Sequence, residues 1–215
     1  MACPLNQVGI EVKAIKQMTK TDGFNEVFFT DALTSTNNVI GGVNNGWRVA
    51  TTLLEYERGG AAAILAPRFE EELGRVKELA RLRGRNNSEL VRQNLAWSHA
   101  RVAAMRLMGY QALERYVMGL TPGVEAALTK LYWTEYHARI TEMALDLLEE
   151  ESLVMRGKHA IIPDGPDAVG TPQESAAWID AFLFARASTI YAGSSEIQRN
   201  LLSERVLAMP KDPKR

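Results

Sequence analysis

A glutamate at position 57 has the surroundings expected of a residue that does chemistry. The apolar pattern from Leu53 to Ile64 passes through Glu57 in steps of three and four residues, so a helix would carry this carboxylate on its apolar side. Desolvation raises the pKa of a buried carboxylate toward the range of a general base. Periodicity alone favours a structural interpretation, in which Glu57 makes a salt bridge within a bundle or lies at a dimer interface, with Arg58 offsetting its burial.

A second candidate is the sequence around Gly193. This glycine permits a tight turn, and Ser194 or Ser195 can cap a following helix. The free N–H groups at such a helix start suit a phosphate or the polar edge of a cofactor. Many helix starts have this composition without a ligand, so the turn alone is a weak indication of a binding site.

The ten residues 190–199 read Ile-Tyr-Ala-Gly-Ser-Ser-Glu-Ile-Gln-Arg. They closely resemble the segment of acyl-CoA dehydrogenases that joins the last two long helices, where many members have a catalytic Glu at the position of Ala192. The stretch 41–60 resembles the entry to the first helix of the family's C-terminal domain. There, isovaleryl- and long-chain-type members carry their base as the Glu of a Glu-Arg pair. Glu57-Arg58 together with Ala192 fits that placement, so the resemblance implies that Glu57 is the catalytic base.

The resemblance implies α,β-dehydrogenation of an acyl-CoA thioester. Glu57 would remove the α-proton while the β-hydrogen leaves as hydride to FAD. Arg58 corresponds to a family residue near the acyl-CoA, and Tyr191 to an aromatic wall of the acyl pocket, with simple packing an equal alternative for Tyr191. The positions of Ser194 and Glu196 contact FAD in the family.

A basic cluster contains Arg81, Arg83 and Arg85 beside Gly84. Such a charge run is usually a solvated face. The family places an Arg followed by Phe-Gly in this region to reach the FAD pyrophosphate of a neighbouring subunit, which makes Arg81 and Arg83 candidate FAD ligands. This sequence lacks the Phe, and the Gln-x-x-Gly-Gly-x-Gly segment that many members use to contact FAD is absent from residues 156–170.

The N-terminal part has the pattern of a β-hairpin. Val8, Ile10 and Val12 alternate with other residues, and a second strand-like run covers 24–29. A lone hairpin is marginal in water, so these strands either lean on the helices or belong to a larger sheet. Residues 34–46 have the composition of a linker. The sequence and the resemblance together predict two domains, with residues 1–43 as the hairpin end of a middle β-domain plus linker and residues 44–215 as a helical bundle.

From Trp47 onward the apolar period is that of a helix, and it resumes after Pro67, which predicts a kink rather than an end. A second helix follows the polar patch that contains Gly84. A third begins at Thr121 with a proline at its first position, a capping box at 171–174 opens a fourth, and a fifth starts near Ser195. We therefore expect a mainly α fold, an up-and-down bundle of about four to five helices preceded by a short β-hairpin.

Composition excludes several classes of function. The 215 residues are 46% hydrophobic and 24% charged, with a formal net charge of −1, which gives no electrostatic case for nucleic acid. A single cysteine and three scattered histidines give no support to a metal site. No apolar stretch is long enough for a membrane span and no signal peptide is evident, so a cytoplasmic location is the default expectation.

The resemblance runs from the final hairpin of the family's middle β-domain to its C-terminal helix. A typical member has further domains before the position of Val8, so we expect this chain alone to bind FAD weakly or not at all. The expected partners are acyl-CoA and either further copies, as a dimer or tetramer, or a flavin-bearing homologue in a hetero-oligomer. The alternative function is a non-catalytic helical subunit for oligomerisation or partner binding.

Overall fold

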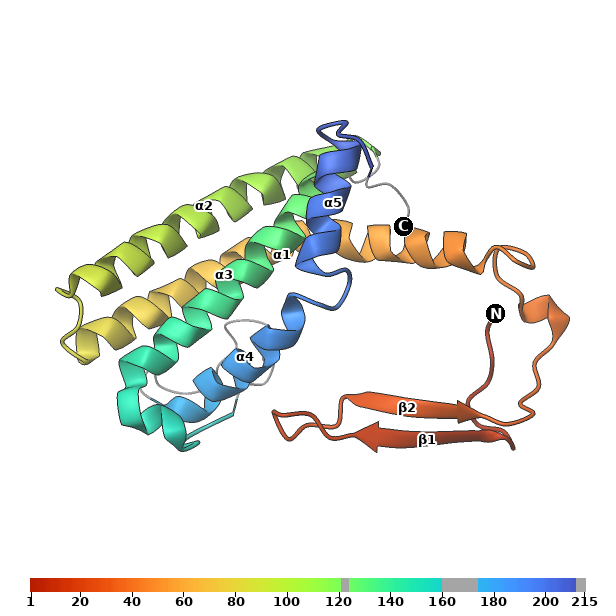
Figure 1. The fold of residues 1–215 in the computed structure, drawn as a ribbon, viewed down its shortest axis with the longest axis horizontal. Helices are drawn as coiled ribbons and strands as arrows, with labels where there is room; N and C mark the ends of the chain where they lie inside the picture. The colour runs from red at the N-terminus through yellow and green to blue at the C-terminus, as the bar shows by residue number, and fades with distance from the viewer. Residues whose placement is uncertain (121–123, 160–173, 212–215) are drawn as a thin grey trace. The chain divides into compact units, whose positions relative to one another are not determined.

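The computed structural model describes residues 1–120, 124–159 and 174–211, with the side chains of 55–64 and 124–126 outside the description. The chain divides into two compact units, Met1–Glu55 and Tyr56–Arg215. The division falls inside a helix, whereas the predicted domain boundary lies between residues 43 and 44 and stays a prediction. Figure 1 shows the order of the elements.

The first unit contains the predicted hairpin. Strands β1 (Ile10–Ile15) and β2 (Phe24–Phe29) pair antiparallel, with Ile10 opposite Phe29 and Ile15 opposite Phe24. At the open end of the ladder, Gly9 has a φ of +88°, and a Cβ there would lie 2.1 Å from the carbonyl oxygen of Thr30. The hairpin is confirmed. Apart from the half-buried Ile10, its residues are exposed on both faces, including three phenylalanines.

The segment predicted as a linker is irregular apart from one short 3-10 helix, η1 (Thr36–Asn38), which Ser35 caps. Helix α1 then runs from Gly46 to Leu82 with Pro67 inside it. The predicted continuation past the proline is therefore confirmed, and the helix stops just before Gly84, whose φ is +65°. A left-handed residue directly after a helix is a common termination signal.

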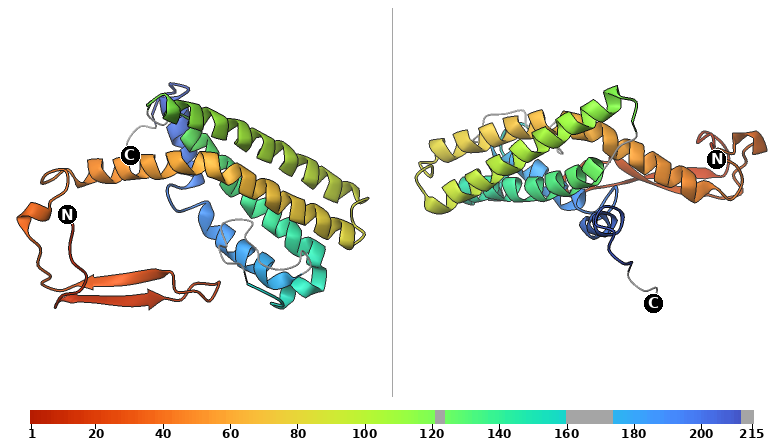
Figure 2. Two further views of the ribbon diagram at one scale, coloured as in Figure 1. Left: turned by 180° about the vertical axis from the view of Figure 1, so that it is seen from behind. Right: turned by 90° about the horizontal axis from the view of Figure 1, so that it is seen from above.

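The described part of the second unit contains four further α-helices: α2 (Glu89–Val117), α3 (Val124–Leu148), α4 (Ser175–Ser188) and α5 (Ser195–Arg205). A 3-10 helix, η2 (Glu149–Leu153), extends α3. The yellow part of α1, then α2 and α3, run in alternating directions side by side, and α4 returns along α3 (Figures 1 and 2). Helix α3 is central because α2, α4 and α5 all pack against it.

The core of the second unit lies mainly among α1, α2 and α3. Its fully buried large side chains include Phe69, Leu73, Met105, Tyr136 and Ile140. These positions repeat at three- and four-residue steps, as a helix requires for one buried face. The mainly α fold, a bundle preceded by a hairpin, is confirmed. None of the described helices combines the length and the apolar character that a membrane span needs.

The starts of α3 and α4 differ in how far the structure describes them. Thr121 and Pro122, predicted to open the third helix, lie outside the described residues, as do residues 171–173 of the predicted capping box. Helix α4 begins at Ser175 with Glu174 as its N-cap and without a capping hydrogen bond from that side chain. The capping box predicted Glu174 to lie inside the helix, so this placement was wrong.

Candidate active site

A tight turn joins α4 to α5 and carries the residues 190–194. The backbone N–H of Tyr191 donates to the carbonyl of Ala187 at 3.1 Å, and that of Ser195 donates to Thr189 at 3.0 Å. Ala192 has a φ of +53°, which is uncommon for a residue with a side chain. The turn is thus closed by its own backbone, and its unusual conformation is held by the surrounding structure.

Gly193 allows this turn to lie close to α5. Its φ is +104°, and a Cβ at this position would meet Nε2 of Gln198 at 2.5 Å. The amide of Gln198 is buried and donates to the carbonyls of Ala192 at 3.4 Å and Gly193 at 3.3 Å. Gln198 therefore fixes the turn from inside the bundle.

Helix α5 begins as the sequence predicts. Ser194 is its N-cap, and the Ser194 hydroxyl accepts a hydrogen bond from the N–H of Ile197 at 3.3 Å. Glu196 lies exposed in the first turn, where hydrogen bonds from its own backbone N–H and from Ser194 lower the pKa of its carboxyl. This end of α5 therefore presents a hydroxyl and an ionised carboxylate at the surface.

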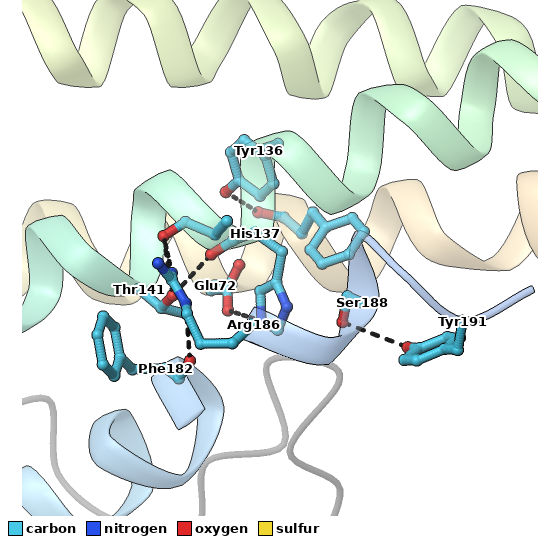
Figure 3. Close-up of polar contacts among 10 residues, drawn as sticks. Glu72, Tyr136, His137, Thr141, Phe182, Arg186, Ser188 and Tyr191 are labelled. Carbon is cyan, nitrogen blue, oxygen red and sulfur yellow. Dashed lines mark hydrogen bonds and ion pairs between the residues drawn. The ribbon is translucent and has the colours of Figure 1, made fainter. Parts of the chain in front are cut away.

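Tyr191 lies on the inner side of the turn. Its ring centroid is 6.4 Å from that of Trp133 and 6.1 Å from that of Phe184. Its hydroxyl lies 3.3 Å from that of Ser188 (Figure 3). The side chain is half-buried against the core, a position that suits both the packing interpretation and the wall of a pocket.

A lysine of α3 lies beneath this turn. Lys130 is 5% exposed, and its ammonium donates to the carbonyl of Ser188, the last residue of α4. The same ammonium lies 5.3 Å from the ring centroid of Trp133 and 5.1 Å from that of Tyr191. Three elements, α3, α4 and the turn, therefore meet at one buried cation.

A second polar group lies deeper in the bundle. His137 and Glu72 are 0% and 1% exposed, and Nε2 of His137 lies 3.1 Å from Oε1 of Glu72 (Figure 3). The Tyr136 hydroxyl donates to the carbonyl of Phe69 at 3.2 Å. Burial, and secondly the charge of Glu72, raise the pKa of Tyr136 well above its usual value, so the phenol stays protonated.

Glu57 and Arg58 lie in α1, but their side chains are outside the part that the structure describes. The structure does bring Tyr191, Ser194 and Glu196 together around one turn.

Residues 44–207 match the C-terminal domain of acyl-CoA dehydrogenases. The chain belongs to the acyl-CoA dehydrogenase family. The matched range covers all five long helices, and it includes both the Glu57-Arg58 pair and the turn at Gly193.

Two curated relatives are called acyl-CoA dehydrogenase IpdE1. The protein from Mycobacterium tuberculosis is 36% identical over 98% of this chain and 50% of its own length. That from Mycolicibacterium smegmatis is 34% identical over 98% of this chain and 49% of its own length. The chain thus spans about half the length of the curated relatives it matches.

Solved structures share the fold. The Tcur3481-Tcur3483 steroid ACAD superimposes with a TM-score of 0.77 at 23% identity, covering 97% of this chain and 51% of that one. The ChsE4-ChsE5 complex from Mycobacterium tuberculosis gives a TM-score of 0.72 at 21% identity, covering 98% and 52%. At these identities the likeness concerns the fold alone.

The two candidate FAD ligands outside the turn, Arg81 and Arg83, lie near the opposite end of α3. Arg83 makes a two-pronged ion pair with Glu151 of η2, at 2.8 and 2.6 Å, and Arg81 pairs with Glu78 of its own helix at 2.6 Å. These pairs lower the pKa of both glutamates through hydrogen bonds from the arginines. Between Lys130 and η2, α3 rises roughly 30 Å, so the arginines and the turn belong to different places on the molecule.

Two groups were not predicted as site residues. Glu72 shares the three- and four-residue spacing of Phe69 and Val76, so the periodicity that singled out Glu57 also marks Glu72 as a buried carboxylate. Lys130 likewise stands in a three- and four-residue repeat with Trp133 and Ile140. The repeat marks it as buried but does not show what it contacts, because that depends on where α4 ends against α3.

Proposed function

We propose that this chain is the C-terminal portion of an FAD-dependent acyl-CoA dehydrogenase that removes the α- and β-hydrogens of an acyl-CoA thioester. The match of residues 44–207 to the family's C-terminal domain carries the proposal. Within it, residues 1–43 correspond to the end of the family's middle β-domain and residues 44–215 to the helical bundle. Its expected location is the cytoplasm.

Glu57 is the proposed base. Ala192 occupies the turn position at which many family members have a carboxylate, so the turn of this chain cannot take a proton there. The Glu57-Arg58 pair on α1 matches the family's other placement of the base. In this arrangement Glu57 removes the α-proton, and Arg58 lies near the thioester as a substrate-binding residue.

The turn between α4 and α5 is the proposed binding edge for substrate and cofactor. Tyr191 has its ring packed against Trp133 and its hydroxyl close to Ser188, so it can form a fixed wall for an acyl chain. The Ser194 hydroxyl and the exposed Glu196 carboxylate are acceptors that suit the hydroxyl and N–H groups of a flavin nucleotide. FAD, when bound, supplies the acceptor for the hydride.

Arg81 and Arg83 are proposed to contact the FAD of a neighbouring subunit, since they lie at the far end of α3 from this turn. Each arginine already has a glutamate partner within the chain. A pyrophosphate bound there would have to compete with Glu78 or Glu151 for the guanidinium groups. Alternatively, it could bind the guanidinium N–H groups that the glutamates do not engage.

The proposed assembly is either a homo-oligomer, as a dimer or tetramer, or a hetero-oligomer with a flavin-bearing homologue. Two solved structures with this fold each have two named components, ChsE4-ChsE5 and Tcur3481-Tcur3483. Acyl-CoA is the proposed substrate. Because one of these structures is called a steroid ACAD, a ring-bearing acyl group is one class to include in a test.

A second candidate function is a non-catalytic helical subunit that oligomerises or completes a homologue's site. The intramolecular ion pairs of Arg81 and Arg83 favour it, because they occupy residues that the enzyme would use for FAD. Both candidates share the family and the fold, and they differ in whether this chain supplies a catalytic group.

Co-purification with candidate flavin-bearing homologues tests the proposal. The complex is isolated, its flavin content is measured, and straight-chain, branched and steroid-ring acyl-CoA thioesters are added without oxygen. If the chain is part of an enzyme, we expect a flavin-containing complex whose flavin absorption band is lost when at least one thioester is added. A complex that gains its full activity equally well when this chain carries Glu57→Gln supports the non-catalytic subunit instead.

A further inference from the structure

The turn that carries Tyr191 and Ser194 is seated on a buried positive charge. Lys130 of α3 is 5% exposed and donates to the carbonyl of Ser188, which is itself 0% exposed. Ser188 is the last residue of α4, so its carbonyl is one of those that the helix leaves without an internal partner. The ammonium thus caps the C-terminal end of α4 at the point where the chain enters the turn.

Three features within the described part of the chain stabilise the ammonium and offset its burial. A charge removed from water is costly unless it is paired or hydrogen-bonded. Here the negative end of the α4 dipole, the Ser188 carbonyl and two aromatic faces surround the cation, with Trp133 at 5.3 Å and Tyr191 at 5.1 Å. One of these faces belongs to the turn, so the position of Tyr191 is coupled to that of Lys130.

A general role in attaching α4 to α3 does not require this lysine. Arg186 of α4 already donates to the carbonyl of Ala138 of α3 at 2.6 Å (Figure 3). Its guanidinium carbon lies 4.4 Å from the ring centroid of Phe182. Lys130 differs from Arg186 in contacting the end of α4 and the turn together, which is the place where the chain reverses toward α5.

We infer that Lys130 is a positioning residue for the α4–α5 turn, holding Tyr191 as the pocket wall and Ser194 with Glu196 at the flavin edge. The inference rests on the proposed function for what the turn binds. Its structural part, that the ammonium fixes the turn, stands on the contacts of Lys130 alone. The two parts can therefore be tested separately.

Amide hydrogen exchange of the isolated chain tests the structural part. Lys130→Met keeps the length and apolar stem of the side chain but removes the charge, Lys130→Arg keeps the charge, and Lys77→Met is the matched control because Lys77 is exposed on α1. The N–H groups of Tyr191 and Ser195, which are hydrogen-bonded to Ala187 and Thr189, report on the turn. No flavin or thioester is present, so the result does not depend on the proposed function.

In Lys130→Met, exchange in the turn is expected to rise about tenfold, the equivalent of one lost charge-assisted hydrogen bond. Exchange in α2 is expected to stay unchanged, Lys130→Arg to recover most of the protection, and Lys77→Met to match the unaltered chain. Unchanged exchange in the turn overturns the inference, because the ammonium then does not hold the turn. An equal rise throughout the bundle also overturns it, because Lys130 then contributes only to the stability of the whole fold.

A measurement on the unaltered chain covers the case in which Lys130→Met does not fold. Nuclear magnetic resonance of the lysine ammonium should show a slowly exchanging Lys130 signal with a coupling across the hydrogen bond to the Ser188 carbonyl carbon. A Lys130 ammonium that exchanges as fast as that of Lys77 contradicts the inference. In the flavin-bearing complex, Lys130→Met should weaken FAD retention more than Lys130→Arg, and equal retention would limit the role of Lys130 to the turn's structure.

Discussion

His137 and Glu72 form a contact sealed inside the bundle, with Nε2 of the histidine 3.1 Å from Oε1 of the glutamate and both side chains at most 1% exposed. The rings of Phe69 and Trp133 pack against the histidine, at centroid distances of 5.6 and 6.4 Å. The pair joins α1 to α3. Two polar groups buried among aromatic rings stabilise a fold only while they remain in contact, because either group alone would be buried without a partner.

His137→Ala should therefore lower the free energy of unfolding by about 3 kcal/mol, because it leaves the Glu72 carboxylate buried without its partner and opens a cavity. His99→Ala is the control, since His99 is exposed on α2 and should change stability by no more than about 0.5 kcal/mol. Urea unfolding followed by circular dichroism gives both values. Equal effects for the two histidines would contradict a structural role for the pair.

Replacing both members of the pair has a different expected outcome. The double variant Glu72→Leu/His137→Phe removes both buried polar groups and fills their space, so it should recover most of the stability lost in His137→Ala. The same unfolding experiment measures it. A double variant less stable than His137→Ala would show that the polar pair itself, rather than the filled volume, holds α1 against α3.

Two glycine-to-alanine changes should have opposite signs. Gly193→Ala places a Cβ 2.5 Å from Nε2 of Gln198 at a φ of +104°, and should destabilise the chain by about 1–3 kcal/mol. Gly74→Ala lies on the exposed side of α1 with nothing within 4 Å of its new Cβ, and should stabilise by about 1 kcal/mol. Thermal unfolding compares the two, and a tolerated Gly193→Ala would mean that the turn differs from its described conformation.

The start of α5 predicts a pH effect. Because hydrogen bonds from its own N–H and from Ser194 lower the pKa of Glu196, the stability they contribute is present above the unfolded-state pKa and is lost as the pH falls through the lower, folded-state pKa. Carboxyl resonances followed by nuclear magnetic resonance should titrate below the ordinary range for Glu196. Ser194→Ala should move this midpoint upward, and an unmoved midpoint would contradict the hydrogen bond between Ser194 and Glu196.

Variants of Arg83 and Glu151 can distinguish a structural role of Arg83 from a role in FAD binding. Arg83→Met removes both donors of the two hydrogen bonds, whereas Glu151→Gln removes the negative charge and leaves one acceptor oxygen. Both variants should therefore lower the melting temperature, Arg83→Met the more. If Arg83 also contacts a neighbouring subunit's FAD, only Arg83→Met should reduce flavin retention in the complex, because Glu151→Gln leaves the guanidinium free to bind phosphate. Equal retention in both variants would confine Arg83 to its ion pair.

Local patterns predicted those features that depend on neighbouring residues. The alternation around Ile10 gave the hairpin, the apolar period on both sides of Pro67 gave one long helix, and Ser194 had the side chain that a helix N-cap requires. The N-cap of α4 was misplaced because a Thr-Pro-Gln-Glu sequence matches a capping box wherever the helix begins.

Features that depend on tertiary packing were out of reach of such patterns. Lys130 and Ser188 are 58 positions apart, and nothing in either neighbourhood indicates that the end of α4 meets that face of α3. The same holds for Glu72 and His137, whose pairing requires α1 and α3 to be adjacent. The proposed role of Glu57 as a base rests on the family resemblance, because periodicity alone indicated only a buried carboxylate.

The most direct test of the central claim is the rate at which an acyl-CoA thioester removes the flavin absorption band in the flavin-bearing complex, compared for the unaltered chain, Glu57→Gln and Glu55→Gln. Loss of a general base should slow the reaction by about 10²–10⁴-fold or more in Glu57→Gln, while the complex still binds FAD and thioester. Glu55→Gln, two residues earlier in the same helix, should react at the unaltered rate. An unaltered rate in Glu57→Gln would contradict the assignment of Glu57 as the base.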